Sequence, residues 1–294
     1  MAAEQLGFEG MPKRLYPCTP SRLNTWLDCP RRYRMTYLDR PKPERGPPWA
    51  HNSMGASVHN ALAGWWRLSL EDRTPEAAGR LLERGWLADG FRDAAQSAKW
   101  RLRAREMVER YASGLDPADE PIGAERTVSM KTHLITVQGR IDRLDRRGAE
   151  LVVVDYKTGR RTLTADDARS SLALALYAAA AWRMMRAPCR LVELHHLPTG
   201  EVAVWEHTEE SLERHLRRAE QIAEECGEAD EWYRAQPAPA ALPTPVNEPF
   251  DEMFPPRPGA LCAWCDYVRH CPEGRLAAPA RQPWSALPDE SSGA

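Results

Sequence analysis

The sequence predicts a mixed α/β protein, because the spacing of its apolar residues is helical at first, strand-like in the middle and helical again later. Up to about residue 115, apolar residues recur three and four positions apart. Residues 125–156 instead contain short runs of β-branched residues separated by turns such as Arg147-Gly148. With 43% apolar and 28% charged residues among 294, the chain is typical of a globular protein with a sizeable core.

The first part of the chain is predicted to be helical. Ser21 is expected to cap a short helix, which Cys29-Pro30 interrupts. Because proline suits the first position of a helix, a second helix is expected over residues 30–37. After a proline-rich loop, further helices are expected from residue 52, over residues 75–89 and over residues 95–113.

Three strands are expected next, over residues 125–130, 133–144 and 150–156. The third contains the apolar run from Leu151 to Val154, which suits a strand buried on both faces. Downstream, the pattern predicts a helix over residues 164–185, a hairpin over 191–207 and a helix over 209–226.

Composition and charge exclude several classes of protein. The longest apolar stretch, residues 172–182, is far shorter than the ~20 residues needed to cross a bilayer, and residues 1–20 lack the apolar run of a secretory signal. We therefore expect a cytoplasmic protein with no membrane partner. In that reducing compartment, seven cysteines indicate metal binding rather than disulfides. The net charge of −2 is no polycation signature, so a DNA-binding face would have to be local.

The most informative window lies at the end of the predicted buried strand. Asp155 and Lys157 are two residues apart and therefore project from the same side of that strand. Asp142, near the end of the preceding strand, is placed to approach Asp155. Two converging carboxylates suit Mg²⁺ or Mn²⁺, and a neighbouring lysine can polarise an attacking water. Surface ion pairs are the alternative, but an apolar strand delivers these charges, and burying charge without a partner is costly.

Three short motifs resemble those of the RecB-like branch of the PD-(D/E)XK nuclease superfamily. They are Gly55-x-x-x-His59, Gly139-x-Ile141-Asp142 and Val154-Asp155-Tyr156-Lys157-Thr158. The resemblance extends over about residues 20–272. It implies a restriction-endonuclease-like core, in which a central mixed sheet is flanked by helices, with a helical insertion between His59 and Glu125. It also implies phosphodiester hydrolysis with Mg²⁺ or Mn²⁺ held by His59, Glu125, Asp142 and Asp155, and with Lys157 assisting the nucleophile.

One position departs from the family pattern. The family usually carries a glutamine four residues before a tyrosine on the helix after the lysine strand, and here Tyr177 is present but Ala173 stands at the glutamine position. A DNA-contacting or lysine-orienting role is thus left unfilled. The candidate DNA contacts are Tyr177 and the arginines Arg31, Arg32, Arg160 and Arg161, although charge runs are more often simply solvated.

A second constellation lies near the C-terminus. Cys262-x₂-Cys265-x₅-Cys271 places three thiols within ten residues of one another, a spacing that indicates a metal site. Tetrahedral zinc or a four-cysteine iron–sulfur cluster would need a fourth ligand. The sequence offers five candidates: Cys18, Cys29, Cys189, Cys226 and His270.

An N-terminal cysteine followed by proline, together with this triplet, resembles the iron–sulfur nucleases, namely the nuclease domain of AddB and the CRISPR-associated iron–sulfur exonucleases. The resemblance selects Cys29 and favours a [4Fe–4S] cluster over zinc. It implies a staple that clasps the first helices to the C-terminal segment, so that cluster binding contributes to folding. The remaining cysteines are expected to be ordinary thiols, and His195 and His196 to be structural.

The expected organisation is a single nuclease domain over residues 21–272, with an N-terminal extension (1–20) and a disordered tail (273–294). Within the domain we expect a helical part at about 52–115, a sheet core at about 122–207, a proline-rich connector at about 235–258 and the cysteine segment at 262–271.

The predicted activity is that of a metal-dependent DNA nuclease, in particular an exonuclease. It would act on single strands or duplex ends in DNA repair, recombination or the processing of foreign DNA, with a helicase or repair protein as an additional partner. The alternative is a catalytically weak or inactive iron–sulfur protein of the same fold that binds DNA as a scaffold, which Ala173 supports. A zinc-bound interaction module without a nucleic-acid role is a third, weaker alternative.

Overall fold

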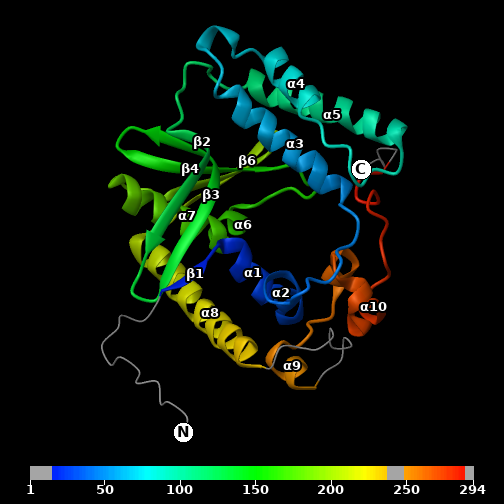
Figure 1. The fold of residues 1–294 in the computed structure, drawn as a ribbon. Coiled ribbons are helices and arrows are strands. Elements are labelled where there is room, and N and C mark those ends of the chain that lie inside the picture. Colours follow the sequence, from blue (N-terminus) through cyan, green and yellow to red (C-terminus); the bar gives the residue numbers. More distant parts are fainter. Residues whose placement is uncertain (1–14, 237–247, 289–294) are drawn as a thin grey trace.

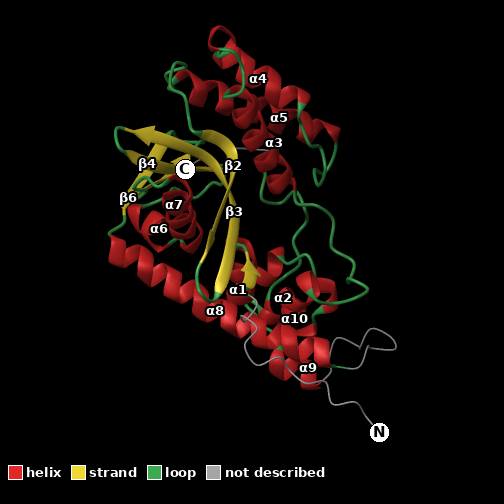
Figure 2. Ribbon diagram, turned by 60° about the vertical axis from the view of Figure 1, so that its left-hand side comes forward, coloured by secondary structure: helices red, strands yellow, loops and turns green. Residues whose placement is uncertain are grey.

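The computed structural model describes residues 15–236 and 248–288. At their centre lies a mixed six-stranded sheet, which helices cover on both faces (Figures 1 and 2). The strands are β1 (Tyr16–Cys18), β2 (Gly123–Lys131), β3 (Ile135–Arg147), β4 (Glu150–Lys157), β5 (Leu191–His196) and β6 (Glu201–Glu206). The predicted mixed α/β class is confirmed.

The helices surround this sheet in two groups. Their bounds in chain order are α1 (Pro20–Asp28), α2 (Pro30–Tyr37), α3 (Ala50–Trp65), α4 (Pro75–Arg84), α5 (Ala94–Ser113), α6 (Ala165–Ser170), α7 (Leu172–Met185), α8 (Glu209–Ala235), α9 (Glu248–Met253) and α10 (Pro272–Ala277). Helices α3, α4 and α5 cover one face of the sheet, and α1, α7 and α8 cover the other.

Strand β4 explains why the sheet is buried on both sides. Leu151 and Val153 pack into the core that contains α7 and α8, whereas Val152 and Val154 pack into the core that contains α3 to α5. Because side chains alternate across a strand, an uninterrupted apolar run is what a strand between two layers requires. The predicted burial of this strand on both faces is confirmed.

The sheet divides beside the middle of β3. Strand β2 pairs antiparallel with β3 along nearly its whole length, on one edge. On the opposite edge, β1 pairs in parallel with residues 135–137 and β4 pairs antiparallel with residues 143–147. Residues 138–142 of β3 therefore have no strand partner on that edge. Strand β5 then joins β4 in parallel, and β6 closes the order β1-β3-β4-β5-β6.

Several element boundaries differ from those predicted. The N-cap of α1 is Thr19, whose hydroxyl accepts from the Arg22 N–H, so the helix begins at Pro20 and not after Ser21. The single helix predicted over 164–185 is two helices, because Ser171 caps α7 and turns the chain between them. Strand β1 lies in the predicted N-terminal extension, and α9 lies in the predicted connector; residues 237–247 of that connector lie outside the described residues.

The prediction of a disordered tail from residue 273 is wrong for residues 273–288. Helix α10 occupies its first part, and Leu287 is buried against α3 to α5. The Gln96 amide donates to the Leu287 carbonyl at 2.9 Å, which fixes the segment further. The buried Leu287 and the partly buried Trp284 both pack into the core that contains α3 to α5, which orders this segment. Residues 289–294 lie outside the described part of the chain.

Among the helices that the structure describes, none is both long and apolar enough to span a lipid bilayer.

Candidate active site and cysteine cluster

Three predicted metal ligands meet at the division of the sheet. His59 comes from α3, Glu125 from β2 and Asp142 from β3, and one ligand atom from each lies within 4.8 Å of the others. They line a pocket of about 620 Å³ that also includes Gly139 and Tyr177. A histidine nitrogen with carboxylate oxygens is a donor set that suits divalent cations such as Mn²⁺ or Mg²⁺.

Asp142 stands where β4 leaves β3. The last ladder pair between these strands is Arg143 with Val154. Beyond it, the Asp142 Oδ2 accepts from the Tyr156 N–H at 2.8 Å, so a side chain satisfies a backbone donor that has lost its strand partner. The Oδ1 atom lies 3.2 Å from His59 Nδ1 and faces the pocket.

Glu125 faces Asp142 across the β2–β3 pair. The flanking pairs, Ala124 with Arg143 and Arg126 with Ile141, place the two carboxylates directly opposite each other. Like charges at such positions are destabilising unless a cation lies between or beside them. Glu125 also has φ 52, a left-handed backbone conformation that side chains rarely adopt and that is found preferentially at functional sites. Arg140 pairs with its carboxylate at 2.5 Å.

The protonation of His59 reflects this negative surrounding. Burial alone would lower the pKa of its imidazole. The hydrogen bond and charge of Asp142, with the charges of Asp155 and Glu125, outweigh burial and raise that pKa above the usual value. A divalent cation would replace the proton as the positive partner of these carboxylates.

Asp155 and Lys157 form an ion pair at the end of β4, a contact that the sequence offers as the alternative to a metal site. Burial raises the pKa of Asp155; Lys157 opposes the rise and Asp142 adds to it. Apart from Lys157, the buried Oδ2 of Asp155 has no hydrogen-bond partner among the described residues. A buried carboxylate oxygen close to the charge of Asp142 fits a site that receives a cation.

Two glycines allow elements to approach closely at this site. A Cβ on Gly139 would lie 2.2 Å from Cε1 of Tyr177, so the tyrosine ring packs directly on the β3 backbone. A Cβ on Gly55 would lie 3.3 Å from Oγ1 of Thr158, so α3 packs against the chain that follows Lys157. The space that the missing side chain of Gly55 leaves is thus taken by Thr158.

Some residues of the pocket were not found from the sequence. Asn60 and Gln138 both line it and supply amide groups. Neither stands in a recognisable motif, and only the helical spacing from Gly55 could have suggested Asn60. Ala173, at the position where the family has glutamine, lies in the first turn of α7.

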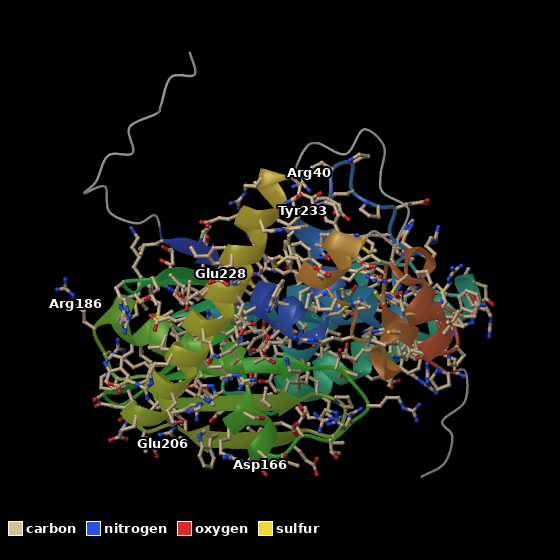
Figure 3. All side chains as sticks on the ribbon, turned by 90° about the horizontal axis from the view of Figure 1, so that it is seen from below. Arg40, Asp166, Arg186, Glu206, Glu228 and Tyr233 are labelled. Atoms are coloured by element: carbon tan, nitrogen blue, oxygen red, sulfur yellow. The ribbon has the colours of Figure 1, made fainter. Side chains whose placement is uncertain are left out.

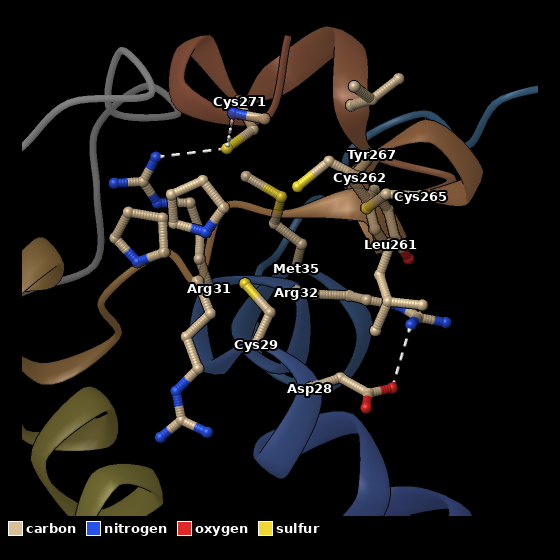
Figure 4. A pocket seen from close by; sticks show the side chains of 15 residues that line it. Asp28, Cys29, Arg31, Arg32, Met35, Leu261, Cys262, Cys265, Tyr267 and Cys271 are labelled. Atoms are coloured by element: carbon tan, nitrogen blue, oxygen red, sulfur yellow. Dashed lines mark hydrogen bonds and ion pairs between the residues drawn. The ribbon is translucent and has the colours of Figure 1, made fainter. Parts of the chain in front are cut away.

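The four predicted cluster ligands line one pocket. Cys29, between α1 and α2, faces Cys262, Cys265 and Cys271 across it (Figure 4). Cys262 lies in the short 3₁₀ helix η2 (Ala260–Trp264) and Cys265 directly follows it, whereas Cys271 lies between the 3₁₀ helix η3 (Val268–His270) and α10. The tertiary structure thus brings Cys29 to three cysteines that follow it by at least 233 residues in the sequence.

The surroundings of these sulfurs suit thiolates. The Gly259 N–H points at Cys262 Sγ at 3.4 Å, and the Gly274 N–H points at Cys271 Sγ at 3.3 Å. The Arg31 guanidinium lies 3.5 Å from Cys271 Sγ. Burial raises the pKa of Cys271, and these donors oppose the rise. Donors and positive charge aimed at buried sulfurs are expected at a metal-binding thiolate group.

The spacing of the sulfurs is wider than that of a tetrahedral zinc site. In the described part of the chain, no three cysteine sulfurs lie within 4.8 Å of one another. Zinc about 2.3 Å from each sulfur would draw them to roughly 4 Å apart. Four thiolates are the ligand set both of a tetrahedral zinc site and of a four-cysteine iron–sulfur cluster.

The other candidate ligands lie elsewhere. Cys18, Cys189 and Cys226 are buried in the core beneath the sheet. Burial raises the pKa of Cys189 and of Cys226 to about 12, so both are thiols at neutral pH. His270 donates from Nε2 to the Glu44 carbonyl at 2.9 Å and does not line the cysteine pocket.

The predicted DNA contacts are in different situations. Arg31 is 1% exposed and ion-paired with Asp251 and Glu273, so it is not available to DNA and its prediction as a contact is corrected. Arg161 is exposed but paired with Asp167 at 2.8 Å. Arg32 lines the cysteine pocket, 3.5 Å from Asp28.

His195 and His196 have the structural surroundings expected of them. His195 lies between Tyr111 Oη at 2.7 Å and Glu193 at 2.9 Å. His196 donates from Nε2 to the Gly159 carbonyl at 2.7 Å, while Nδ1 accepts from the Thr199 hydroxyl at 2.7 Å. The hydrogen bond to the Gly159 carbonyl anchors the chain that follows Lys157.

Three comparisons with known proteins were made. No curated protein matches the chain. Among solved structures, a protein from Eubacterium rectale described as a "putative exonuclease" is similar to it with a TM-score of 0.48 and 10% sequence identity, over 82% of this chain and 91% of that one. The family model of the PD-(D/E)XK nuclease superfamily matches residues 17–272. That match covers most of the chain, so the chain belongs to the PD-(D/E)XK nuclease superfamily.

Proposed function

We propose that this protein is a divalent-metal-dependent deoxyribonuclease, in particular an exonuclease that acts on single strands or duplex ends. The observation that carries the proposal is the meeting of His59, Glu125 and Asp142 within 4.8 Å, beside the Asp155–Lys157 pair. Two carboxylates and an imidazole gathered in an open pocket, with the buried Asp155 nearby, are costly to a protein unless a cation compensates them.

Mg²⁺ or Mn²⁺ would be held by His59, Glu125, Asp142 and Asp155. Such a cation would supply Lewis-acid activation of the phosphate and a lower pKa for the attacking water. Asp142 orients His59 through its Oδ1, and the Tyr156 N–H fixes Asp142. Lys157, 45% exposed at the end of β4, is placed to offset the charge that develops on the phosphate oxygens.

The four pocket cysteines would hold a [4Fe–4S] cluster, with zinc as the alternative metal. Supporting the cluster are the wide spacing of the sulfurs and the donors that point at them. Because Cys29 lies near the start of the domain and Cys271 near its end, the cluster would close a loop that contains the whole nuclease core. Repair, recombination or processing of foreign DNA in the cytoplasm, with a helicase or repair partner, is the biological setting we propose.

The central test is cleavage of labelled single-stranded and double-stranded DNA with Mg²⁺ or Mn²⁺. We expect degradation by the wild-type protein, and its loss in Asp155→Ala and in Lys157→Ala, with unchanged circular dichroism. Asp166→Ala, an exposed aspartate on α6, is the matched control and should retain activity. Full activity of Asp155→Ala would exclude the mechanism.

The cluster is tested by anaerobic purification and metal analysis. We expect about four irons per chain with a brown colour, and loss of iron in Cys29→Ser. Cys189→Ala removes a buried thiol outside the pocket and should keep its iron. One zinc per chain would instead identify a zinc site.

One observation favours a second candidate, a DNA-binding scaffold with little or no catalysis: Ala173 replaces the family glutamine at the start of α7. A scaffold would bind DNA without divalent metal and would cleave no substrate under any metal tested. Restoration of strong cleavage by Ala173→Gln in an otherwise weak enzyme would show that this position limits activity.

A further inference from the structure

We propose that a groove beside the active site binds the single-stranded DNA that leads to it; this inference rests on the proposed nuclease function. The groove has a volume of about 520 Å³ and lies between the first turns of α3, the chain after β4 and the C-terminal segment. Its lining includes His51, Gly55, Arg160, Trp264 and Arg281.

The C-terminal segment forms one wall of this groove. After α10 the chain returns to the start of α3, as the red segment in Figure 1 shows. The Ala50 N–H donates to the Pro283 carbonyl at 3.1 Å, and Gln96 holds the Leu287 carbonyl. A segment that carries no predicted catalytic residue is thus fastened next to the active site.

The groove borders the metal pocket. Gly55 lines both cavities, and its missing side chain leaves α3 and Thr158 in close contact between them. From His51 to His59 along α3 the distance is about 12 Å at ~1.5 Å per residue, or roughly three stacked base steps of ~3.4 Å. A strand whose phosphate lies at His59 would therefore occupy the groove with its next few nucleotides.

Two uncompensated positive charges line the groove. Arg160 and Arg281 are both exposed, and neither has a carboxylate partner within 4.0 Å among the described residues. The neighbouring Arg161 differs, because Asp167 neutralises it. Arginines without a carboxylate partner in one groove are complementary to a phosphate backbone.

Aromatic side chains also line the groove. Trp264 packs on Trp49, with 5.1 Å between ring centroids, and on His51 at 5.4 Å. The Arg281 guanidinium lies 4.7 Å over the Trp264 ring. Unstacked bases bind to aromatic rings and to guanidinium planes, which an intact duplex does not expose.

The dimensions also favour one strand. A cavity of about 520 Å³ lies within the range of about 300–1,000 Å³ that encloses one small ligand. A nucleotide or two fit this space, whereas a duplex, whose major groove alone is about 12 Å wide, does not. Backbone charge, aromatic rings and cavity size thus agree on single-stranded DNA.

The test is binding of a labelled single-stranded oligonucleotide in EDTA, followed by fluorescence anisotropy between about 50 and 200 mM salt. Arg160→Gln and Arg281→Gln should each weaken binding about 3- to 10-fold and make the salt dependence shallower by about 0.7, the value for one lost phosphate contact on a single strand. The control is Arg186→Gln, an exposed arginine at the far end of the molecule from the cysteine segment (Figure 3), which should bind as wild type.

Three outcomes would overturn the proposal. The first is wild-type affinity and salt slope in both groove variants; the second is an equal loss in Arg186→Gln. The third is an equal effect of Arg281→Gln on a blunt duplex of the same sequence. An abasic oligonucleotide should bind at least about 5-fold more weakly than a normal one. Equal binding of the two would show that the aromatic rings do not contact the bases.

This experiment separates the groove from the nuclease. Binding in EDTA does not depend on cleavage, so weakened binding in the arginine variants supports the groove even if no DNA is degraded. If cleavage disappears in Asp155→Ala but Arg160→Gln and Arg281→Gln bind as wild type, the nuclease function is supported and the groove is excluded.

Discussion

Asp142 binds the backbone of Tyr156: its Oδ2 accepts from the Tyr156 N–H at 2.8 Å where the β3–β4 ladder has ended. The carboxylate therefore has two tasks. One oxygen completes the hydrogen bonding of the divided sheet, and the other faces His59 in the pocket. Structure and proposed metal binding thus depend on the same side chain, and substitutions can separate them.

Asp142→Asn is expected to keep the fold and lose the cation. The amide oxygen can still accept from Tyr156, but the charge is gone, so we expect Mn²⁺ affinity and cleavage to fall by about 100-fold or more, because even the partners of metal ligands contribute 10–100-fold. Asp142→Ala should additionally lower the free energy of unfolding by about 1–3 kcal/mol, since it leaves a buried N–H without an acceptor. Calorimetric titration with Mn²⁺ and urea unfolding measure the two effects; equal stability of both variants would contradict the assignment.

The buried Asp155 predicts that the metal-free protein is destabilised at neutral pH. Because burial raises its folded-state pKa above the unfolded value, its contribution to stability is present below the unfolded pKa and is lost as pH rises through the folded pKa. In EDTA at neutral pH, Asp155→Asn should therefore raise Tm, by about 2–4 °C for each kcal/mol relieved.

The same substitution should reduce the rise in Tm that Mn²⁺ causes in the wild type. Thermal melts of both proteins across acidic to neutral pH provide the measurement, and the difference between them should grow with pH. Asp166→Asn, fully exposed on α6, should show no such difference. A lower Tm of Asp155→Asn throughout this range would contradict the prediction.

Gly139→Ala is expected to displace Tyr177. The added methyl would stand 2.2 Å from the ring, and relief of such overlap typically costs about 1–3 kcal/mol of unfolding free energy. Because Tyr177 lies beside the carboxylates, which with burial raise the pKa of its hydroxyl to about 12, DNA binding or cleavage should fall as well. Tyr177→Ala in the same chain should recover the stability but not the activity. A double-mutant cycle by urea unfolding checks the coupling, and additive effects would argue against the contact.

Arg31 is expected to hold the cysteine segment rather than DNA. Its guanidinium is buried between Asp251, Glu273 and Cys271, and Arg31→Met would leave both carboxylates without their partner. Breaking a fully buried pair costs about 3–5 kcal/mol; since these carboxylates are 21% and 37% exposed, we expect about 2 kcal/mol.

Iron content per chain should fall together with that stability. Arg32→Met, the next residue, is the control: its ion pair with Asp28 is exposed and should contribute less than about 1 kcal/mol. If Arg31→Met left iron and stability intact but weakened DNA binding, the original prediction of a DNA contact would be restored.

Local patterns were enough to locate most of the candidate site. The buried strand 151–154, the Asp155–Lys157 spacing and the helix that carries His59 all follow from periodicity, because a strand alternates its side chains and a helix repeats them every three to four residues. The cysteine triplet is equally local. These features depend on neighbours in sequence, and the structure reproduces them.

What the sequence could not decide is where distant segments meet. The division of the sheet beside residues 138–142, the left-handed backbone of Glu125 and the burial of Arg31 arise from packing between elements far apart in the chain. So does the return of residues 278–288 to α3, which no local pattern gave reason to expect. By itself the sequence determined which residue types are available for metal, sulfur and phosphate chemistry. Only the tertiary structure decided which of them face one another, because burial and charge pairing are settled by contacts across the fold.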